Sequence, residues 1–91
     1  MSEKIGEYLS VVEETMPENY TTKGWYVLSC GNTTLGSIGW DRRWRQYVLY
    51  PNENTQWSAG CLTDVATFLR LRNAEHTAES MKRRTAAKVG V

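Results

Sequence analysis

Residues 25–50 read WYVLSCGNTTLGSIGWDRRWRQYVLY and set the architecture of the chain. Within this stretch, runs rich in β-branched and aromatic residues predict strands at residues 25–30, 35–40 and 45–50. A short fourth strand or an extended crossing can follow at 55–58. Consecutive strands with short connections pair as an antiparallel meander, which we expect over residues 23–58.

The connections between these runs differ in kind. Gly31 and Asn32 tolerate positive φ angles and predict a tight hairpin between the first two strands. The second connection, at 41–44, is charged and aromatic instead of rich in glycine or proline. Gly36 and Gly39 inside the second run indicate a bulge or a close approach of backbones.

The segments on either side of the meander show helical spacing. In residues 1–16 the apolar positions are Ile5, Tyr8, Leu9, Val12 and Met16, which predicts an amphipathic helix that Pro17 ends. In residues 61–75 the apolar positions are Cys61, Leu62, Val65, Phe68 and Leu69, which predicts a second helix. Residues 76–91 either extend this helix or form a mobile basic tail.

The sequence therefore predicts one α+β domain over residues 1–91. It has an N-terminal helix, a three- to four-stranded antiparallel β-meander, and a C-terminal helix packed on one face of the sheet. The expected core is Trp25, Val27, Leu28, Ile38, Val48, Leu62, Val65, Phe68 and Leu69.

Charge and composition narrow the classes of partner. The net charge is +1, but residues 1–20 hold five glutamates and one lysine, and from position 61 onward six basic residues outnumber three acidic ones. No membrane span or signal peptide is recognisable, so we expect a cytoplasmic protein with free thiols at Cys30 and Cys61. A homodimer is possible if the apolar stripe of the first helix is exposed.

The densest candidate site is the run WDRRWRQY at 40–47, in which arginines alternate with aromatic residues. The residues expected to contact a partner are Arg42, Arg43, Trp44, Arg45 and Tyr47. Tryptophan, tyrosine and arginine are enriched at protein interfaces, and they also bind single-stranded nucleic acid by stacking and by phosphate contacts. A third interpretation places the tryptophans in the core and the arginines on a solvated turn. In the strand, the face with Arg45 and Tyr47 is expected to be the exposed one.

Residues for catalysis or for a bound group are scarce. Cys30, Cys61 and His76 could form a thiolate and base only if the fold brings them together. No pair of metal ligands has the usual spacing, and no glycine loop precedes a helix as phosphate binding requires. We therefore expect no enzyme activity, no metal and no cofactor.

The segments WRQYVLYP at 44–51, WSAGCL at 57–62 and FL at 68–69 resemble small proteins encoded by tailed bacteriophages. The resemblance covers residues 35–73 and carries no catalytic signature or assigned functional residue. It implies a binding protein that inhibits or adapts a host protein in the host cytoplasm, including proteins of host defence. The alternative is a nucleic-acid-binding protein that uses the same arginine-aromatic run and the basic tail.

Overall fold

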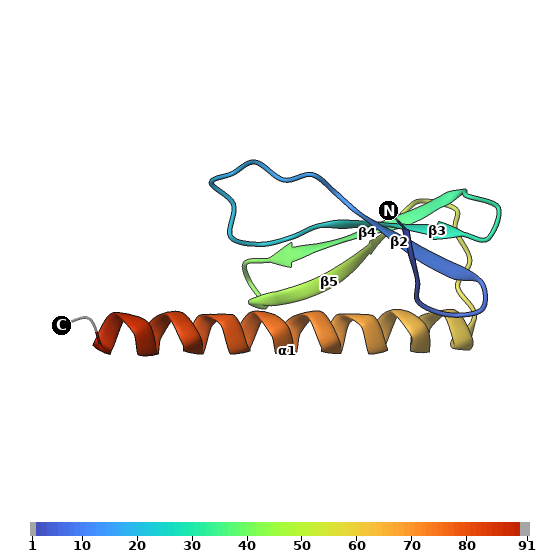
Figure 1. Cartoon of the computed structure of the whole chain (residues 1–91). Helices are drawn as coiled ribbons and strands as arrows, with labels where there is room; N and C mark the ends of the chain where they lie inside the picture. The colour runs from blue at the N-terminus through green and yellow to red at the C-terminus, as the bar shows by residue number, and fades with distance from the viewer. Residues whose placement is uncertain (1, 90–91) are drawn as a thin grey trace.

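One antiparallel sheet is covered on one face by a long helix (Figure 1). The computed structural model describes residues 2–89, with side chains described through residue 82. The elements are β1 (Ser2–Lys4), β2 (Leu9–Glu13), β3 (Trp25–Ser29), β4 (Thr34–Asp41), β5 (Gln46–Pro51) and α1 (Ala59–Val89). Strand order in the sheet follows the chain, β1-β2-β3-β4-β5, so each strand pairs with the next.

The prediction of an N-terminal helix over residues 1–16 is wrong, because this segment forms the β1–β2 hairpin. Leu9 and Val11 are both buried, and a spacing of two residues is the period of a strand. Gly6 falls in the middle of the expected helix, where glycine is unfavourable, and the chain turns there instead. Pairing of β2 with β3 along its whole length then outweighs the weak helical pattern. The sheet therefore has five strands instead of three or four.

The β3–β4 hairpin is formed by a turn residue and a bulge. Asn32 adopts a φ of 63°, and its N–H donates a hydrogen bond to the carbonyl oxygen of Ser29 at 2.9 Å. The register with β4 shifts between Val27 and Leu28, which places a bulge in the pairing. The turn thus uses asparagine in the left-handed region, as the sequence indicates.

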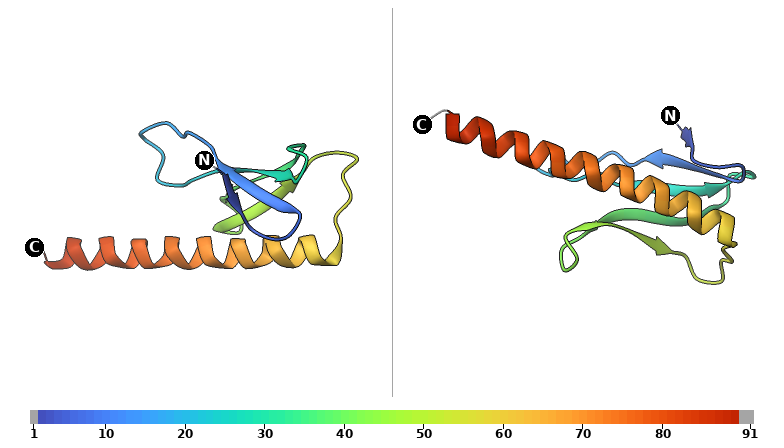
Figure 2. Two further views of the ribbon diagram at one scale, coloured as in Figure 1. Left: turned by 45° about the vertical axis from the view of Figure 1, so that its right-hand side comes forward. Right: turned by 90° about the horizontal axis from the view of Figure 1, so that it is seen from below.

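The helix closes the core from below in Figure 1. It begins after Ser58, whose hydroxyl accepts a hydrogen bond from the N–H of Cys61 at 3.1 Å. Val65 and Phe68 lie on the face of α1 that contacts the sheet. The buried core is Leu9, Val11, Trp25, Val27, Ile38, Tyr47, Val65 and Phe68. Figure 2 shows α1 crossing the sheet obliquely and continuing beyond it toward its C-terminal end.

Residues 76–89 of the expected tail continue this helix, and residues 90–91 lie outside the described residues. Within residues 2–89, no helix combines the length and the apolar character that a membrane crossing requires.

Three of the expected core residues lie elsewhere. Leu62 is 49% exposed, because it is about a quarter-turn around α1 from the buried side chains of Val65 and Phe68. Leu28 and Val48 are half-buried on the sheet face opposite the helix. We call this second face of the sheet the open face.

Gly36 is required where β4 and β5 approach each other. A Cβ atom at this position would lie 2.7 Å from the carbonyl oxygen of Tyr50. Both atoms are fixed by the backbone, so no side-chain rotation can relieve this contact. Gly36→Ala is therefore expected to lower the free energy of unfolding by about 1–3 kcal/mol. Gly39→Ala is the matched control, because a Cβ there meets only Tyr50 Cε2 at an ordinary 3.7 Å. Chemical denaturation of both variants tests this requirement, and equal losses would contradict it.

Candidate functional site

The β4–β5 turn is held by the backbone and by one carboxylate. Asp41 Oδ1 accepts hydrogen bonds from the N–H groups of Arg43 and Trp44 at 2.8 and 3.0 Å. The N–H of Arg45 donates to the carbonyl oxygen of Asp41 at 2.8 Å, and Arg45 adopts the left-handed φ of 54°. Aspartate at the first position of a turn forms this pattern readily, so this charged connection forms a turn without glycine or proline.

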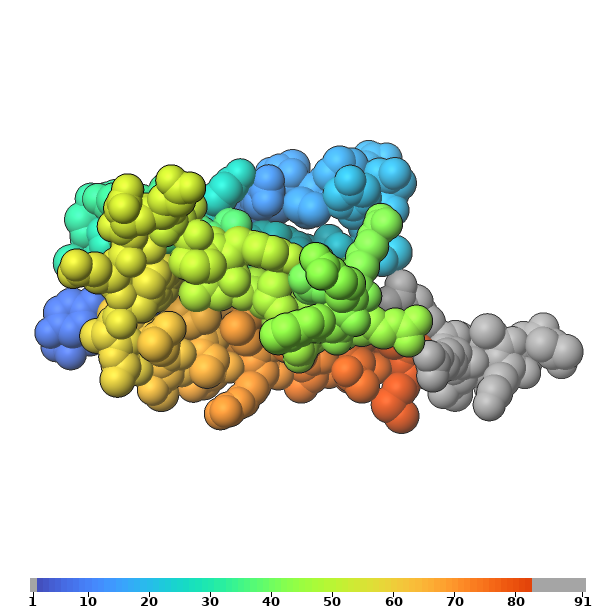
Figure 3. Space-filling model, turned by 180° about the vertical axis from the view of Figure 1, so that it is seen from behind, coloured from blue at the N-terminus to red at the C-terminus, as the bar shows by residue number. Residues whose placement is uncertain are grey.

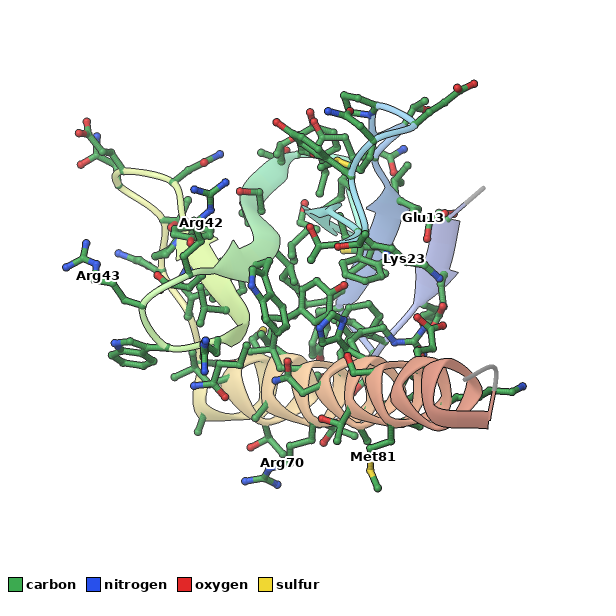
Figure 4. The ribbon with its side chains drawn as sticks, turned by 90° about the vertical axis from the view of Figure 1, so that its left-hand side faces the viewer. Glu13, Lys23, Arg42, Arg43, Arg70 and Met81 are labelled. Carbon is green, nitrogen blue, oxygen red and sulfur yellow. The ribbon has the colours of Figure 1, made fainter. Side chains whose placement is uncertain are left out.

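This geometry exposes four of the five predicted contact residues: Arg42, Arg43, Trp44 and Arg45. Trp44 is the most exposed large apolar side chain described, at 71%. Figure 4 shows Arg42 and Arg43 pointing away from α1, with Arg43 directed off the molecule. The turn therefore presents an aromatic ring and guanidinium groups together, as the sequence predicts.

Tyr47, the fifth predicted contact residue, is buried and cannot form part of an exposed surface. Only 5% of it is exposed, and its ring meets those of Trp25 and Trp40 edge to face. Its hydroxyl accepts a hydrogen bond from the N–H of Lys23, and its own N–H donates to Asn73 Oδ1 at 2.7 Å. The sequence prediction has the two faces of β5 the wrong way round, because the register of β5 in the sheet decides which face meets the helix.

A cleft of about 620 Å³ lies on the open face, beside this turn. One wall is the long β2–β3 connection, residues 14–24, and the other comes from β4, β5 and their turn. We call it the open-face cleft; its principal lining residues are Met16, Tyr20, Gly24, Gly39, Arg42 and Tyr50. Seen from behind in Figure 3, green atoms of the β4–β5 hairpin reach from the orange helix up to the light-blue atoms of the β2–β3 connection.

Two glycines lie in the floor of the open-face cleft. Trp25 pairs with Ile38, so Gly24 and Gly39, the next residues outward on each strand, lie across from each other on the open face. Neither glycine has a positive φ, so the backbone conformation at both positions is one that any residue can adopt. Gly39 leaves space here, because an added Cβ would meet only Tyr50 Cε2 at 3.7 Å, whereas a Cβ at Gly24 would lie 2.9 Å from Glu14 Oε2.

Tyr20 and Tyr50 line this cleft, and Tyr26 lies on the same face of the sheet. Tyr26 pairs with Ser37, and Ser37 pairs with Tyr50, so two half-exposed rings flank a serine across three strands. Carboxylates hold both hydroxyl groups. Tyr26 donates to Glu14 Oε1 at 3.1 Å, and Tyr50 donates to Asp41 Oδ2 at 3.4 Å.

These contacts change the pKa values of Tyr26, Tyr50 and Asp41. The hydrogen bond to Glu14 raises the pKa of Tyr26, while burial and the charge of Asp41 raise the pKa of Tyr50. The hydrogen bond from the Trp44 N–H, with that from Arg43, lowers the pKa of Asp41. Both tyrosines are therefore neutral hydrogen-bond donors at pH 7, and Asp41 is ionised.

Asp41 gives the turn a pH dependence with a defined sign. Because its folded pKa is lowered, its contribution to stability is complete above the ordinary value of 3.8 and disappears as the pH falls through the folded value. Asp41→Asn keeps a side-chain oxygen but does not titrate. We expect the variant to be less stable than the native protein at about pH 7, with the difference shrinking toward about pH 2. Urea denaturation across this range measures it, and a difference that is constant with pH would refute the assignment.

Charge is unevenly distributed around the open-face cleft. On the turn side Arg42 lines the cleft, and the carboxylate of Asp41 is already engaged by backbone N–H groups. The connection side contributes Glu14 and Lys23 to the lining. Lys23 lies at this edge with its ammonium 4.0 Å from the carboxylate of Glu13, and Figure 4 shows the pair side by side. The turn side of the cleft is thus positive, and the connection side carries charges of both signs.

The candidate residues for nucleophilic chemistry are separated in the fold. Cys61 and His76 lie on the same helix about 22 Å apart along its axis, given a rise of about 1.5 Å per residue. His76 stacks on Trp40, and Cys30 lies beyond the end of β3 in the exposed hairpin turn. Across the described residues, no group of three or more histidine, cysteine, aspartate or glutamate side chains is placed to hold a metal ion.

The β2–β3 connection is the part of the site that sequence reasoning misses. The sequence predicts a helix up to residue 16 and a short linker at 18–22, whereas in the structure residues 14–24 together form a wall of the cleft. Gly24 and Gly39 are the signal in the sequence, because glycines on neighbouring strands leave a gap, but their pairing is visible only once the register is known.

No family model, curated protein or solved structure matches this chain. The assignment of the site therefore depends on its geometry.

Proposed function

We propose that the protein is a binding module that takes a segment of a partner protein into the open-face cleft. The β4–β5 turn contacts the same partner through Arg42, Arg43 and Trp44. The supporting observation is the cleft itself, which Tyr20, Tyr50 and Arg42 line, together with the exposed Trp44 in the adjacent turn. In line with the bacteriophage resemblance, the partner we propose is a host protein that this chain inhibits or adapts.

The volume and lining of the cleft favour recognition of a chain segment. About 620 Å³ is within the range of sites that enclose small ligands, about 300–1,000 Å³. Tyrosine, tryptophan and arginine are the side chains that contribute most to protein interfaces, and all three line or border this cleft. The exposed rings of Tyr20 and Tyr50 supply contact area with little loss of side-chain entropy.

The charges argue against nucleic acid as the principal ligand. Glu14 and Asp41 bind the two tyrosine hydroxyls, so a phosphate backbone running over these rings would meet two carboxylates. One observation still favours nucleic acid as the second candidate. Tyrosines on a sheet face resemble in arrangement the platforms on which single-stranded bases stack.

A pull-down from bacterial lysate tests the proposal. The tagged protein, an Arg42→Ala/Trp44→Ala variant and an Arg70→Ala control serve as baits, with and without nuclease and at low and high salt. Arg70 points away from the sheet in Figure 4, so its replacement leaves the cleft and the turn untouched. We expect one dominant protein that survives nuclease and salt, is retained by the control and is lost with the double variant. Capture that depends on nucleic acid would support the second candidate instead.

A further inference from the structure

A second hollow lies on the other side of the sheet, between the β4–β5 turn and α1. It has a volume of about 340 Å³, and we call it the turn–helix pocket; its principal lining residues are Trp40, Arg45, Gln46, Asn73, His76 and Ser80. We propose that this pocket binds an oxyanion, the carboxylate or phosphate group of a ligand. It shares only Trp40 with the lining of the open-face cleft, and the proposal does not depend on the function proposed for that cleft.

The helix contributes a row of polar side chains to this pocket. Asn73, His76, Thr77 and Ser80 follow the spacing i, i+3, i+4, i+7, so they lie along one side of α1. Among the described residues, the hydroxyl groups of Thr77 and Ser80 have no hydrogen-bond partner. The hydroxyls of two threonines earlier in the helix, in contrast, donate to carbonyl oxygens at 2.9 and 3.0 Å. Both hydroxyls at the pocket are therefore available to a ligand.

Two further groups present hydrogen-bond donors to the pocket. Asn73 Oδ1 accepts the N–H of Tyr47 at 2.7 Å, which leaves the NH₂ group of the same amide without a partner among the described residues. The guanidinium of Arg45 has five N–H donors, no acceptor and a permanent positive charge. Within the part of the chain whose side chains are described, Arg45 forms no ion pair. A negatively charged acceptor satisfies both groups, whereas a cation satisfies neither.

No carboxylate in the lining offsets this positive charge. The described residues that line the pocket include no aspartate and no glutamate. Of the acidic residues nearby, Asp41 is engaged by the N–H groups of its own turn, and Glu75 pairs with Arg72 at 3.2 Å. Glu79 lines a separate, smaller hollow together with Lys23. The electrostatic preference of the turn–helix pocket is therefore for an anion.

The size and the aromatic wall of the pocket suit a group that is partly removed from water. A volume of about 340 Å³ lies at the lower end of the range for small-molecule sites, about 300–1,000 Å³. Trp40 and His76 form the wall, with their ring centroids 4.2 Å apart. Rings on one side reduce the contact of a bound anion with water, which strengthens its attraction to Arg45.

Titration of the isotopically labelled protein with sodium phosphate and with sodium acetate, followed by NMR, tests the proposal. The side-chain N–H signals of Arg45, Gln46 and Asn73 report on the pocket directly. We expect at least one of the two anions to shift these signals to saturation, and sodium chloride at equal ionic strength to leave them unsaturated. The anion that binds more tightly identifies phosphate or carboxylate as the preferred group.

Two arginines of the same turn provide matched variants. Arg45→Gln removes the charge from the pocket and is expected to weaken binding of the anion at least about tenfold. Arg43→Gln removes the same charge from a side chain that does not line the pocket and is directed off the molecule in Figure 4, so we expect unchanged affinity. Both arginines are exposed, so both variants are expected to fold normally.

The outcomes decide the proposal without reference to the open-face cleft. Loss of binding confined to Arg45→Gln would support it. Shifts that rise linearly with salt, or that chloride reproduces, would overturn it, because they would report ionic strength instead of a site. Equal weakening by the two variants would also overturn it, because the general charge of the turn would then attract the anion. Capture of the partner protein is tested by the pull-down alone.

Discussion

Trp25→Ala is expected to lower the free energy of unfolding by about 3–5 kcal/mol, more than any other substitution we propose. The indole is 4% exposed and lies at the centre of the core. Its ring packs edge to face against Phe68 from the helix at 5.2 Å and against Tyr47 from β5 at 5.3 Å. Removing it leaves a cavity where the helix joins the sheet. Domains of this size are stable by about 5–15 kcal/mol, so the loss is a large fraction of the total stability.

Trp44→Ala is the matched control, because it removes the same side chain from the exposed β4–β5 turn. Its expected change in stability is within about 0.5 kcal/mol. Denaturation followed by circular dichroism measures both variants without relying on tryptophan emission. Similar losses for the two substitutions would mean that the helix does not pack over Trp25 as described.

Gly39→Val is expected to weaken capture of the partner strongly while leaving the protein folded. A Cβ at this position makes only an ordinary contact with Tyr50, and the two methyl groups of valine project into the open-face cleft. Valine also favours strands, so we expect a change in stability within about 0.5 kcal/mol. The partner segment loses the floor on which it lies, and the affinity is expected to fall by at least about tenfold, or 1.4 kcal/mol.

Gly31→Val serves as the control for this substitution. Gly31 lies in the β3–β4 turn, where an added Cβ meets only Ser29 Oγ at 3.9 Å, away from the cleft. Affinity for the captured partner, measured by calorimetry or by surface-bound titration, is expected to be unchanged in this variant. Equal binding by Gly39→Val and the native protein would exclude the cleft as the contact surface.

The strands around residues 25–50 and the C-terminal helix follow from local sequence, and the predicted strand ends agree with the structure within about two residues. β-branched and aromatic runs separated by turn residues leave few alternatives there. The first segment cannot be assigned in this way. Its apolar residues fit a helical stripe, but Val11 and Val12 gain more by pairing with β3 than by helical packing. That gain comes from a strand further along the chain and is invisible in the segment itself.

The candidate site is only partly predictable for the same reason. The exposed turn residues can be identified because arginine beside tryptophan is conspicuous in sequence. The sequence prediction puts Tyr47 on the exposed face because alternation along a strand shows which residues share a face, but it does not show which face the helix covers. The cleft depends on Gly24, Gly39 and the β2–β3 connection, which the sheet register brings together.

Hydrogen exchange of the protein alone and in complex with its captured partner tests the role of the open-face cleft most directly. We expect slower exchange on binding in residues 14–24 and in the β4–β5 hairpin, with no change along α1. Protection confined to α1, with the β2–β3 connection and the hairpin unaffected, would contradict the assignment of this cleft as the binding site.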